Sequence, residues 1–143
     1  MTADDPFDLG RFVEAQDAGA TYQRAVAELE TGRKVTHWMW FVFPQIAGLG
    51  RSATARRYAI SSRAEAEAYL RHPVLGPRLR AAAGIVARSA APSPAELLGS
   101  VDALKLRSSM TLFARAAPDE PVFTEVLARF FGGEPDGATD ERL

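Results

Sequence analysis

The stretch from His37 to Gln45, HWMWFVFPQ, places the strongest constraint on the fold. Its nine residues include two tryptophans, two phenylalanines, a methionine and a valine. Removing such surface from water is strongly favourable, so a core, a partner or a ligand must cover it. A chain of 143 residues fits one domain and is long enough to bury most of the surface that its unfolded form exposes.

Whether this stretch is a strand or a helix depends on the rest of the chain. Aromatic residues and valine favour a strand, but we find no second convincing strand, and an unpaired strand leaves its backbone groups unsatisfied. Thr36 can cap a helix that starts at His37, and Pro44 disfavours helix at the preceding residue. We therefore expect a short, fully buried helix, which belongs at the centre of the domain because it is apolar on all sides.

Helix signals recur along the remaining sequence. Tyr22, Ala25 and Leu29 follow helical spacing, and Ser62 with Glu65 forms a capping box. Further helix starts or caps are expected at Ser52, Pro77, Ser93–Pro94 and Asp102, and helix ends at Gly32 and Gly132–Gly133.

The predicted fold class is therefore mainly α. We expect a single compact multi-helix globular domain over residues 1–133, with a central aromatic helix. Residues 134–143, EPDGATDERL, are expected to form a polar, flexible C-terminal tail.

Composition excludes several function classes. There is no cysteine, and His37 and His72 lie far apart with no metal-binding spacing, so we predict neither a metal site nor a cofactor. The longest apolar run is too short to span a bilayer and no signal peptide is visible, so we expect a cytoplasmic protein without a membrane partner. The net charge of −1 argues against general nucleic-acid binding.

Charge is nevertheless unevenly distributed. No Asp or Glu occurs between Thr31 and Ala64, a window that contains six Lys and Arg residues and the aromatic stretch. Basic residues among aromatic ones suit an anionic ligand with flat rings. The alternative is that these arginines pair with carboxylates from other helices.

The loop IAGLGRS, Ile46 to Ser52, follows the aromatic stretch. Gly48 and Gly50 would let backbone amides face outward, Ser52 would cap the next helix, and Arg51 can bind phosphate through two N–H groups. The loop matches neither a Walker A motif nor a dinucleotide fingerprint. An ordinary turn between helices is the alternative.

A second cluster is KLRSSMT, from Lys105 to Thr111. On a helix, Lys105, Ser108 and Ser109 share one face, where an ammonium beside two hydroxyls could hold a carboxylate or phosphate, or activate a serine. The alternative is a lysine at a helix edge with small residues chosen for close packing.

Acid–base candidates lie near the N-terminus and at the start of the aromatic stretch. Glu14 and Asp17 flank Gln16 in FVEAQD, and His37 precedes Trp38. Capping and loop formation are the ordinary explanation for Asp17, and a core histidine is the alternative for His37.

The run GRKVTHWMWFVFPQIAGLGRS, with RYAI after it, resembles a family catalogued as domain of unknown function 1810, whose members are often labelled calpastatin-like. FVEAQD, EAEAYLRHPVLGPRL, LLGSVDALKLRSSMTLFA and VFTEVLARFFGG match the same pattern, so the likeness runs from about Pro6 to Gly133. One departure is LLGS, where the family more often has an aromatic residue before glycine. The calpastatin label implies a disordered inhibitor, which this core-forming composition does not fit.

The resemblance implies a mainly helical fold and transfers no catalytic residue. It marks five polar positions that a core does not require: Lys34, His37, Gln45, Lys105 and Ser109.

Two hypotheses of function follow. In the first, the protein binds a small anionic, ring-bearing molecule of the nucleotide or ADP-ribose type and, if it is an enzyme, hydrolyses an N-glycosidic bond with His37, Glu14 or Asp17 as acid or base. In the second, it is a non-enzymatic helical protein–protein interaction module. The oligomeric state is not predicted. The expected ligand-binding residues are Lys34, Trp38, Trp40, Gln45, Gly48, Gly50, Arg51, Ser52, Lys105 and Ser109, with Phe41 as a further stacking candidate.

Overall fold

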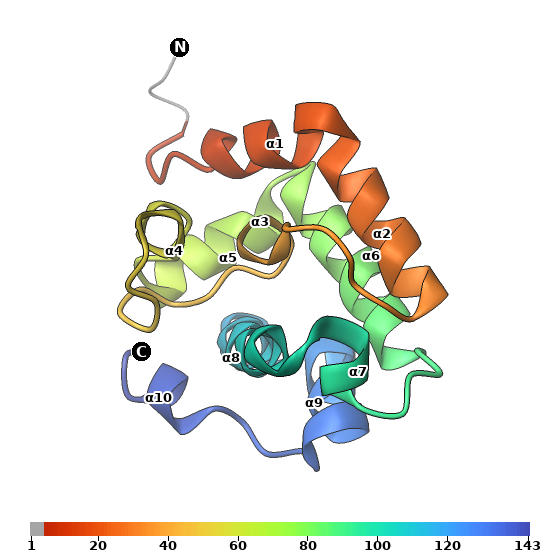
Figure 1. Ribbon diagram of the computed structural model, residues 1–143. Coiled ribbons are helices and arrows are strands. Elements are labelled where there is room, and N and C mark those ends of the chain that lie inside the picture. The colour runs from red at the N-terminus through yellow and green to blue at the C-terminus, as the bar shows by residue number, and fades with distance from the viewer. Residues whose placement is uncertain (1–4) are drawn as a thin grey trace.

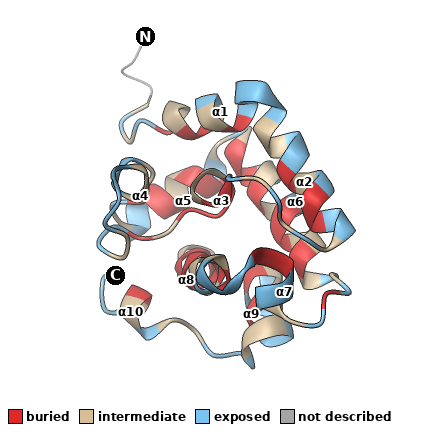
Figure 2. Ribbon diagram, viewed as in Figure 1, coloured by how far each residue is buried: buried red, intermediate tan, exposed pale blue. Residues whose placement is uncertain are grey.

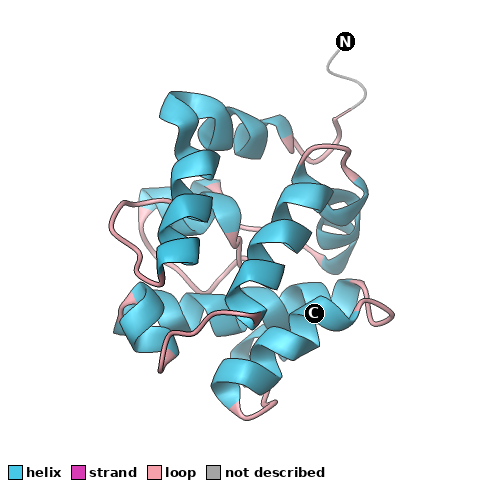
Figure 3. Ribbon diagram, turned by 90° about the vertical axis from the view of Figure 1, so that its right-hand side faces the viewer, coloured by secondary structure: helices cyan, strands magenta, loops and turns pink. Residues whose placement is uncertain are grey.

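The computed structural model describes residues 5–143, and its regular elements are helices (Figure 3). They are α1 (Gly10–Asp17), η2 (Ala18–Ala20), α2 (Thr21–Thr31), α3 (Met39–Val42), α4 (Ala53–Arg57), α5 (Arg63–Arg71), α6 (Leu75–Ala87), α7 (Pro94–Leu98), α8 (Ser100–Ala116), α9 (Pro121–Phe131) and α10 (Gly137–Asp140). Over residues 5–143, β pairing is limited to a parallel bridge between Ile46 and Ile60. The predicted mainly α, single-domain fold is confirmed.

The helix α8 forms the middle of the domain. It packs against α5, α7, α9 and α10, and Figure 1 views it nearly end-on, with α1 and α2 on the far side of α5 and α6. Every residue from Ser108 to Ala114 is buried, so α8 lacks a polar face over this length (Figure 2). A helix of this kind requires neighbours on all sides.

Aromatic side chains connect the helices through the core. The ring centroids of Phe12 and Tyr69 lie 5.2 Å apart, those of Tyr69 and Phe113 5.3 Å, and those of Phe113 and Phe123 5.9 Å. This series joins α1, α5, α8 and α9, and all four rings are buried. Pairs at these separations add to the stabilisation from burial alone.

The aromatic stretch is helical, but its helix is shorter than predicted. α3 begins at Met39, after Trp38, and Thr36 does not cap it. His37 is exposed, and Trp40 is only half-buried, so the helix is not buried on every side as expected. The difference arises because Thr36 does not cap α3 but donates its hydroxyl to Glu28 on α2.

Local capping signals are largely correct. The hydroxyls of Ser52, Ser62 and Ser93 accept hydrogen bonds from the amides three residues later, which confirms these three caps. Two expected starts are wrong. α6 begins at Leu75, before Pro77, and α8 begins at Ser100, so Asp102 lies in its first turn.

The C-terminal segment, residues 134–143, lies against α8. The guanidinium of Arg115 donates to both carboxylate oxygens of Asp140 at 2.8 and 2.9 Å. Asp136 accepts hydrogen bonds from Ser108 and Thr139, and Thr139 is fully buried. The flexibility of this segment stays a prediction, but these contacts hold it on the domain.

Two glycines of α6 provide a test of packing between α5 and α6. A Cβ on Gly76 would lie 2.2 Å from the Leu70 carbonyl oxygen, whereas a Cβ on Gly84 would meet only the end of the Arg88 side chain at 3.1 Å. Gly76→Ala should therefore lower the free energy of unfolding by about 2 kcal/mol despite its better helix propensity.

Gly84→Ala is the matched control and should be neutral or stabilising by up to about 1 kcal/mol. Urea unfolding of both variants measures the difference. Equal stability of the two would contradict the close contact at Gly76.

Candidate functional site

A small hollow lies between α3, α4 and the loop from Ile46 to Ser52, which we call the glycine loop. Its volume is about 180 Å³, and we call it the Trp40 hollow. Four residues expected from the sequence to bind ligand line it together: Trp40, Gln45, Gly48 and Gly50. The other lining residues are Ile46, Ala47, Ala55, Arg56, Tyr58 and Ala59.

Backbone pairing fixes the loop that lines the Trp40 hollow. The amide of Ala47 donates to the Ile60 carbonyl, and the amide of Ile60 donates to the Gln45 carbonyl, both at 2.8 Å. Gly50 packs against α4 so closely that a Cβ there would lie 2.5 Å from the Ala55 methyl group. Gly48 has φ +99°, which favours glycine.

Backbone amides along this loop are free to bind a ligand. Within residues 5–143, the amides of Gly48, Leu49 and Gly50 donate to no protein acceptor. Outward-facing amides of consecutive loop residues attract anions. α4 itself has only five residues, so its dipole adds little to this field.

Lys105 does not line the hollow itself but lies over the ring of Trp40, which does. Its Nζ is 4.6 Å from the centroid of the Trp40 ring and 3.2 Å from an oxygen of Asp102. The other oxygen of Asp102 pairs with Lys34 at 2.9 Å. Two ammonium groups thus share one carboxylate. Both lysine side chains are largely shielded from water, with Lys34 9% exposed and Lys105 23% exposed.

Lys34, Lys105 and Asp102 together carry a net charge of +1. Removing a charge from water without a partner is unfavourable. An anion in contact with Lys105 would balance this charge.

Trp38 belongs to the core and not to a ligand site. Its side chain is fully buried, and its indole N–H donates to Glu28 at 2.8 Å. The predicted stacking role is incompatible with this burial, although Lys34 does lie over the ring at 5.3 Å.

Glu28 organises the chain that leads into α3. Its carboxylate accepts hydrogen bonds from the Val35 amide, the Thr36 amide and hydroxyl, and the Trp38 indole. Burial alone would raise the pKa of Glu28, but these hydrogen bonds, those from Thr36 first, outweigh it and lower the pKa from 4.5 to about 2. Glu28 therefore stays ionised in the folded protein, without a cationic partner among residues 5–143.

The acid–base candidates do not meet at the hollow. None of Glu14, Asp17 and His37 lines it. Asp17 instead pairs with Arg78 at 2.9 Å, and Glu14 and His37 are exposed. Among residues 5–143, no carboxylate or imidazole lines the hollow to transfer protons.

Five further predicted residues do not line the hollow, and two of them, Lys34 and Lys105, pair with Asp102 instead. Arg51 is exposed at the end of the glycine loop, and Ser52 uses its hydroxyl to cap α4. Ser109 is fully buried, and within the described residues its hydroxyl has no hydrogen-bond partner. Ser108, beside it, bonds to Asp136, so the two serines do not form one patch with Lys105.

Two arginines near the hollow were missed from the sequence. Arg142 lies on Gly48, with its Nε 2.9 Å from the position that a Cβ would take. Arg11 holds the end of α4 through the Arg57 and Ala59 carbonyls, at 2.8 Å each. Arg142 was missed because it lies in the predicted tail, and nothing in the sequence around Arg11 indicates these contacts.

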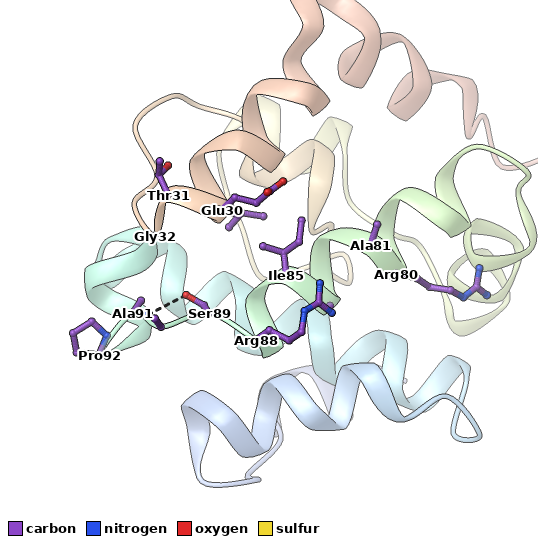
Figure 4. A pocket seen from close by; sticks show the side chains of 13 residues that line it. Glu30, Thr31, Gly32, Arg80, Ala81, Ile85, Arg88, Ser89, Ala91 and Pro92 are labelled. Atoms are coloured by element: carbon purple, nitrogen blue, oxygen red, sulfur yellow. Dashed lines mark hydrogen bonds between the residues drawn. The ribbon is translucent and has the colours of Figure 1, made fainter.

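A larger groove of about 900 Å³ lies between α2, α6 and residues 88–92 (Figure 4). It contains charges of both signs, Glu30 and Arg88 among them, and its Arg80 is already paired with Glu120 at 2.7 Å. Among the described residues, no aromatic side chain lines this groove. The Trp40 hollow is smaller but is the better candidate, because Trp40, Arg56 and two glycines of the loop line it together.

Residues 5–143 contain no group of three or more His, Asp or Glu residues placed to hold a metal ion. In the same range, no helix is both long and apolar enough to cross a membrane.

Comparisons with known proteins give one family and one solved structure. The crystal structure of the conserved hypothetical protein Rv1873 from Mycobacterium tuberculosis is 52% identical in sequence, with a TM-score of 0.94, and the match covers 97% of this chain and 98% of that one. A comparison with curated proteins finds no match. The sequence family described as "Protein of unknown function (DUF1810)" matches residues 6–143. This match spans nearly the whole chain, and the chain therefore belongs to the DUF1810 family.

Proposed function

We propose that this protein binds a small anionic, ring-bearing molecule of the nucleotide or ADP-ribose type at the Trp40 hollow. One observation carries the proposal: Trp40, Gln45, Gly48 and Gly50 line a single hollow, and the Lys105 ammonium lies 4.6 Å above the Trp40 ring. An aromatic wall, a loop whose amides have no protein acceptor among residues 5–143, and a cation over the same tryptophan suit a ring that carries a negative group.

The size of the hollow limits how much ligand it covers. A volume of about 180 Å³ admits one ring or one phosphate group, and is smaller than the sites that enclose whole ligands. The remainder of a nucleotide would lie outside, near Arg56. We therefore expect modest affinity, with a Kd on the order of 10–100 μM.

Hydrolysis of an N-glycosidic bond gains no support from the arrangement of the acid–base candidates. Such a reaction needs an acid or base within hydrogen-bond reach of the bond that breaks, and Glu14, Asp17 and His37 do not line the hollow. Binding is accordingly proposed without catalysis.

Tryptophan fluorescence tests the proposal because the two indoles differ in exposure. Trp38 is sealed, whereas Trp40 is half-buried at the hollow. Saturable quenching by AMP or ADP-ribose is expected in the natural chain and should disappear in Trp40→Phe. Lys105→Met should weaken binding about tenfold, as measured by calorimetry, because an ion–anion contact is lost.

Arg63→Gln is the control for Lys105→Met. It removes one positive charge from the side chain that pairs with Glu67 on the surface of α5, and it should leave the affinity unchanged. Absence of saturable binding by either ligand at millimolar concentration would contradict the proposed function.

A non-enzymatic helical interaction module is the second candidate. Val35, Val101 and Leu104 are 71%, 66% and 64% exposed, and the last two lie one turn apart on α8. This candidate predicts no saturable quenching in the titration above.

A further inference from the structure

We infer that Arg142 binds the negative group of the ligand and that the C-terminal segment positions the Arg142 guanidinium beside the Trp40 hollow. The inference rests on the proposed function and extends it by orienting the ligand: ring inward against Trp40, phosphate outward between Arg142 and the glycine loop.

The first support is the position of the guanidinium. The Nε, Cδ and Cζ atoms of Arg142 all lie within 4 Å of the point where a Cβ on Gly48 would be, the nearest at 2.9 Å. Any side chain at position 48 would displace it. Figure 1 shows the C-terminus beside the loop that precedes α4, far from it in sequence.

The second support is unused hydrogen-bonding capacity. Arg142 donates from Nη1 to the Ala138 carbonyl at 2.8 Å, its one acceptor within residues 5–143. It forms no ion pair in that range, unlike Arg115 and Arg80, whose carboxylate partners are close. A guanidinium has five N–H donors, so most of them are available beside the free amides of Gly48 and Leu49.

The third support is that the segment is anchored just before Arg142. Asp140 forms a two-point ion pair with Arg115, and Thr139, in the same segment, is fully buried. Arg107 donates to the Glu134 and Pro135 carbonyls at 3.0 and 3.1 Å. The anchors lie on α8, the helix that also carries Lys105, so one rigid element positions both cations.

The ligand class follows from this placement. A planar guanidinium next to outward-facing amides matches the oxygens of a phosphate or carboxylate. The Trp40 hollow, with its apolar wall and small volume, suits the ring. The ligand class is therefore a ring that carries a phosphate or carboxylate group, and AMP is a probe of this class.

Calorimetric titration of the full chain with AMP and adenosine tests the inference. The two ligands share the ring and the pentose and differ in the phosphate. Arg142→Gln should weaken AMP binding about tenfold and leave adenosine binding unchanged, because it removes only the phosphate contact. Arg142→Lys should fall between, since it keeps the charge but not the planar fork.

Arg63→Gln again controls for loss of one surface charge and should alter neither titration. Equal AMP affinities of Arg142→Gln and the natural chain would overturn the inference while the proposed function stands. A natural chain that binds neither AMP nor adenosine would overturn both. Arg142 is exposed, so its replacement should leave the thermal midpoint unchanged, and an unchanged midpoint would exclude unfolding as the cause of weaker binding.

Discussion

Glu28→Gln should lower the free energy of unfolding by about 3 kcal/mol, because the hydrogen bonds that lower the pKa of Glu28 to about 2 stabilise its ionised carboxylate in the folded protein. The carboxylate satisfies donors from Val35, Thr36 and Trp38. An amide has one acceptor oxygen and would set its NH₂ group against some of these donors. Urea unfolding measures the loss, and Glu14→Gln, at an exposed position, is the control.

The pH dependence of this difference provides an independent check. Because the folded-state pKa of Glu28 is lowered from 4.5 to about 2, its stabilisation is complete above pH 4.5 and is lost as the pH falls towards 2. The stability difference between the natural chain and Glu28→Gln should therefore shrink over this interval. A difference under about 0.5 kcal/mol at pH 7 would contradict the role of Glu28.

Arg11→Met is expected to have an effect of similar size, about 3–5 kcal/mol, because it leaves a buried carboxylate unpaired. Arg11 pairs with Glu65 at 2.9 Å, and their side chains are 11% and 3% exposed. Its remaining donors bind the Phe7, Asp8, Arg57 and Ala59 carbonyls. The loss should appear as a lower urea midpoint with an unchanged slope.

A double-mutant cycle separates the ion pair from the carbonyl contacts of Arg11. Adding Glu65→Gln to Arg11→Met removes the unpaired charge, so the double variant should be more stable than Arg11→Met alone. Arg63→Met, in an exposed pair with Glu67, should change stability by less than about 0.5 kcal/mol. Strict additivity of the two substitutions would show that the pair does not act as a unit.

Much of the fold could be predicted because its signals are local. Ser52, Ser62 and Ser93 each reach an amide three residues ahead, a contact that depends on nearby sequence alone. The ends of α2 and α9 at Gly32 and Gly132, both with positive φ, follow from the same kind of signal.

The parts that could not be predicted depend on tertiary contacts. Glu28 lies on a helix pattern that normally places acids in water, and only the return of residues 35–38 buries it. Closely spaced aromatic residues do not reveal which ring faces inward, so the sequence predicted a ligand contact for Trp38 and Trp40 alike. Arg142 reaches Gly48 because the C-terminal segment folds along α8, and its polar composition gives no sign of this.

Part of the candidate site could be predicted because several of its residues are close together in the sequence. Gln45, Gly48 and Gly50 belong to one loop, so their proximity to one another follows from chain connectivity. Lys105 comes from α8, and its contact with Trp40 could not be derived without the packing of that helix. The acid–base candidates do not line the hollow, although His37 lies only three residues before Trp40 in the sequence.

The central claim is that the Trp40 hollow is the place where a ring-bearing anion binds. Titration of the ¹⁵N-labelled chain with AMP, followed by amide and indole NMR signals, tests it most directly. We predict saturable shifts at the Trp40 indole N–H and the Gly48 and Gly50 amides, with the Trp38 indole unmoved. Shifts confined to the groove between α2 and α6, or none at all, would contradict the claim.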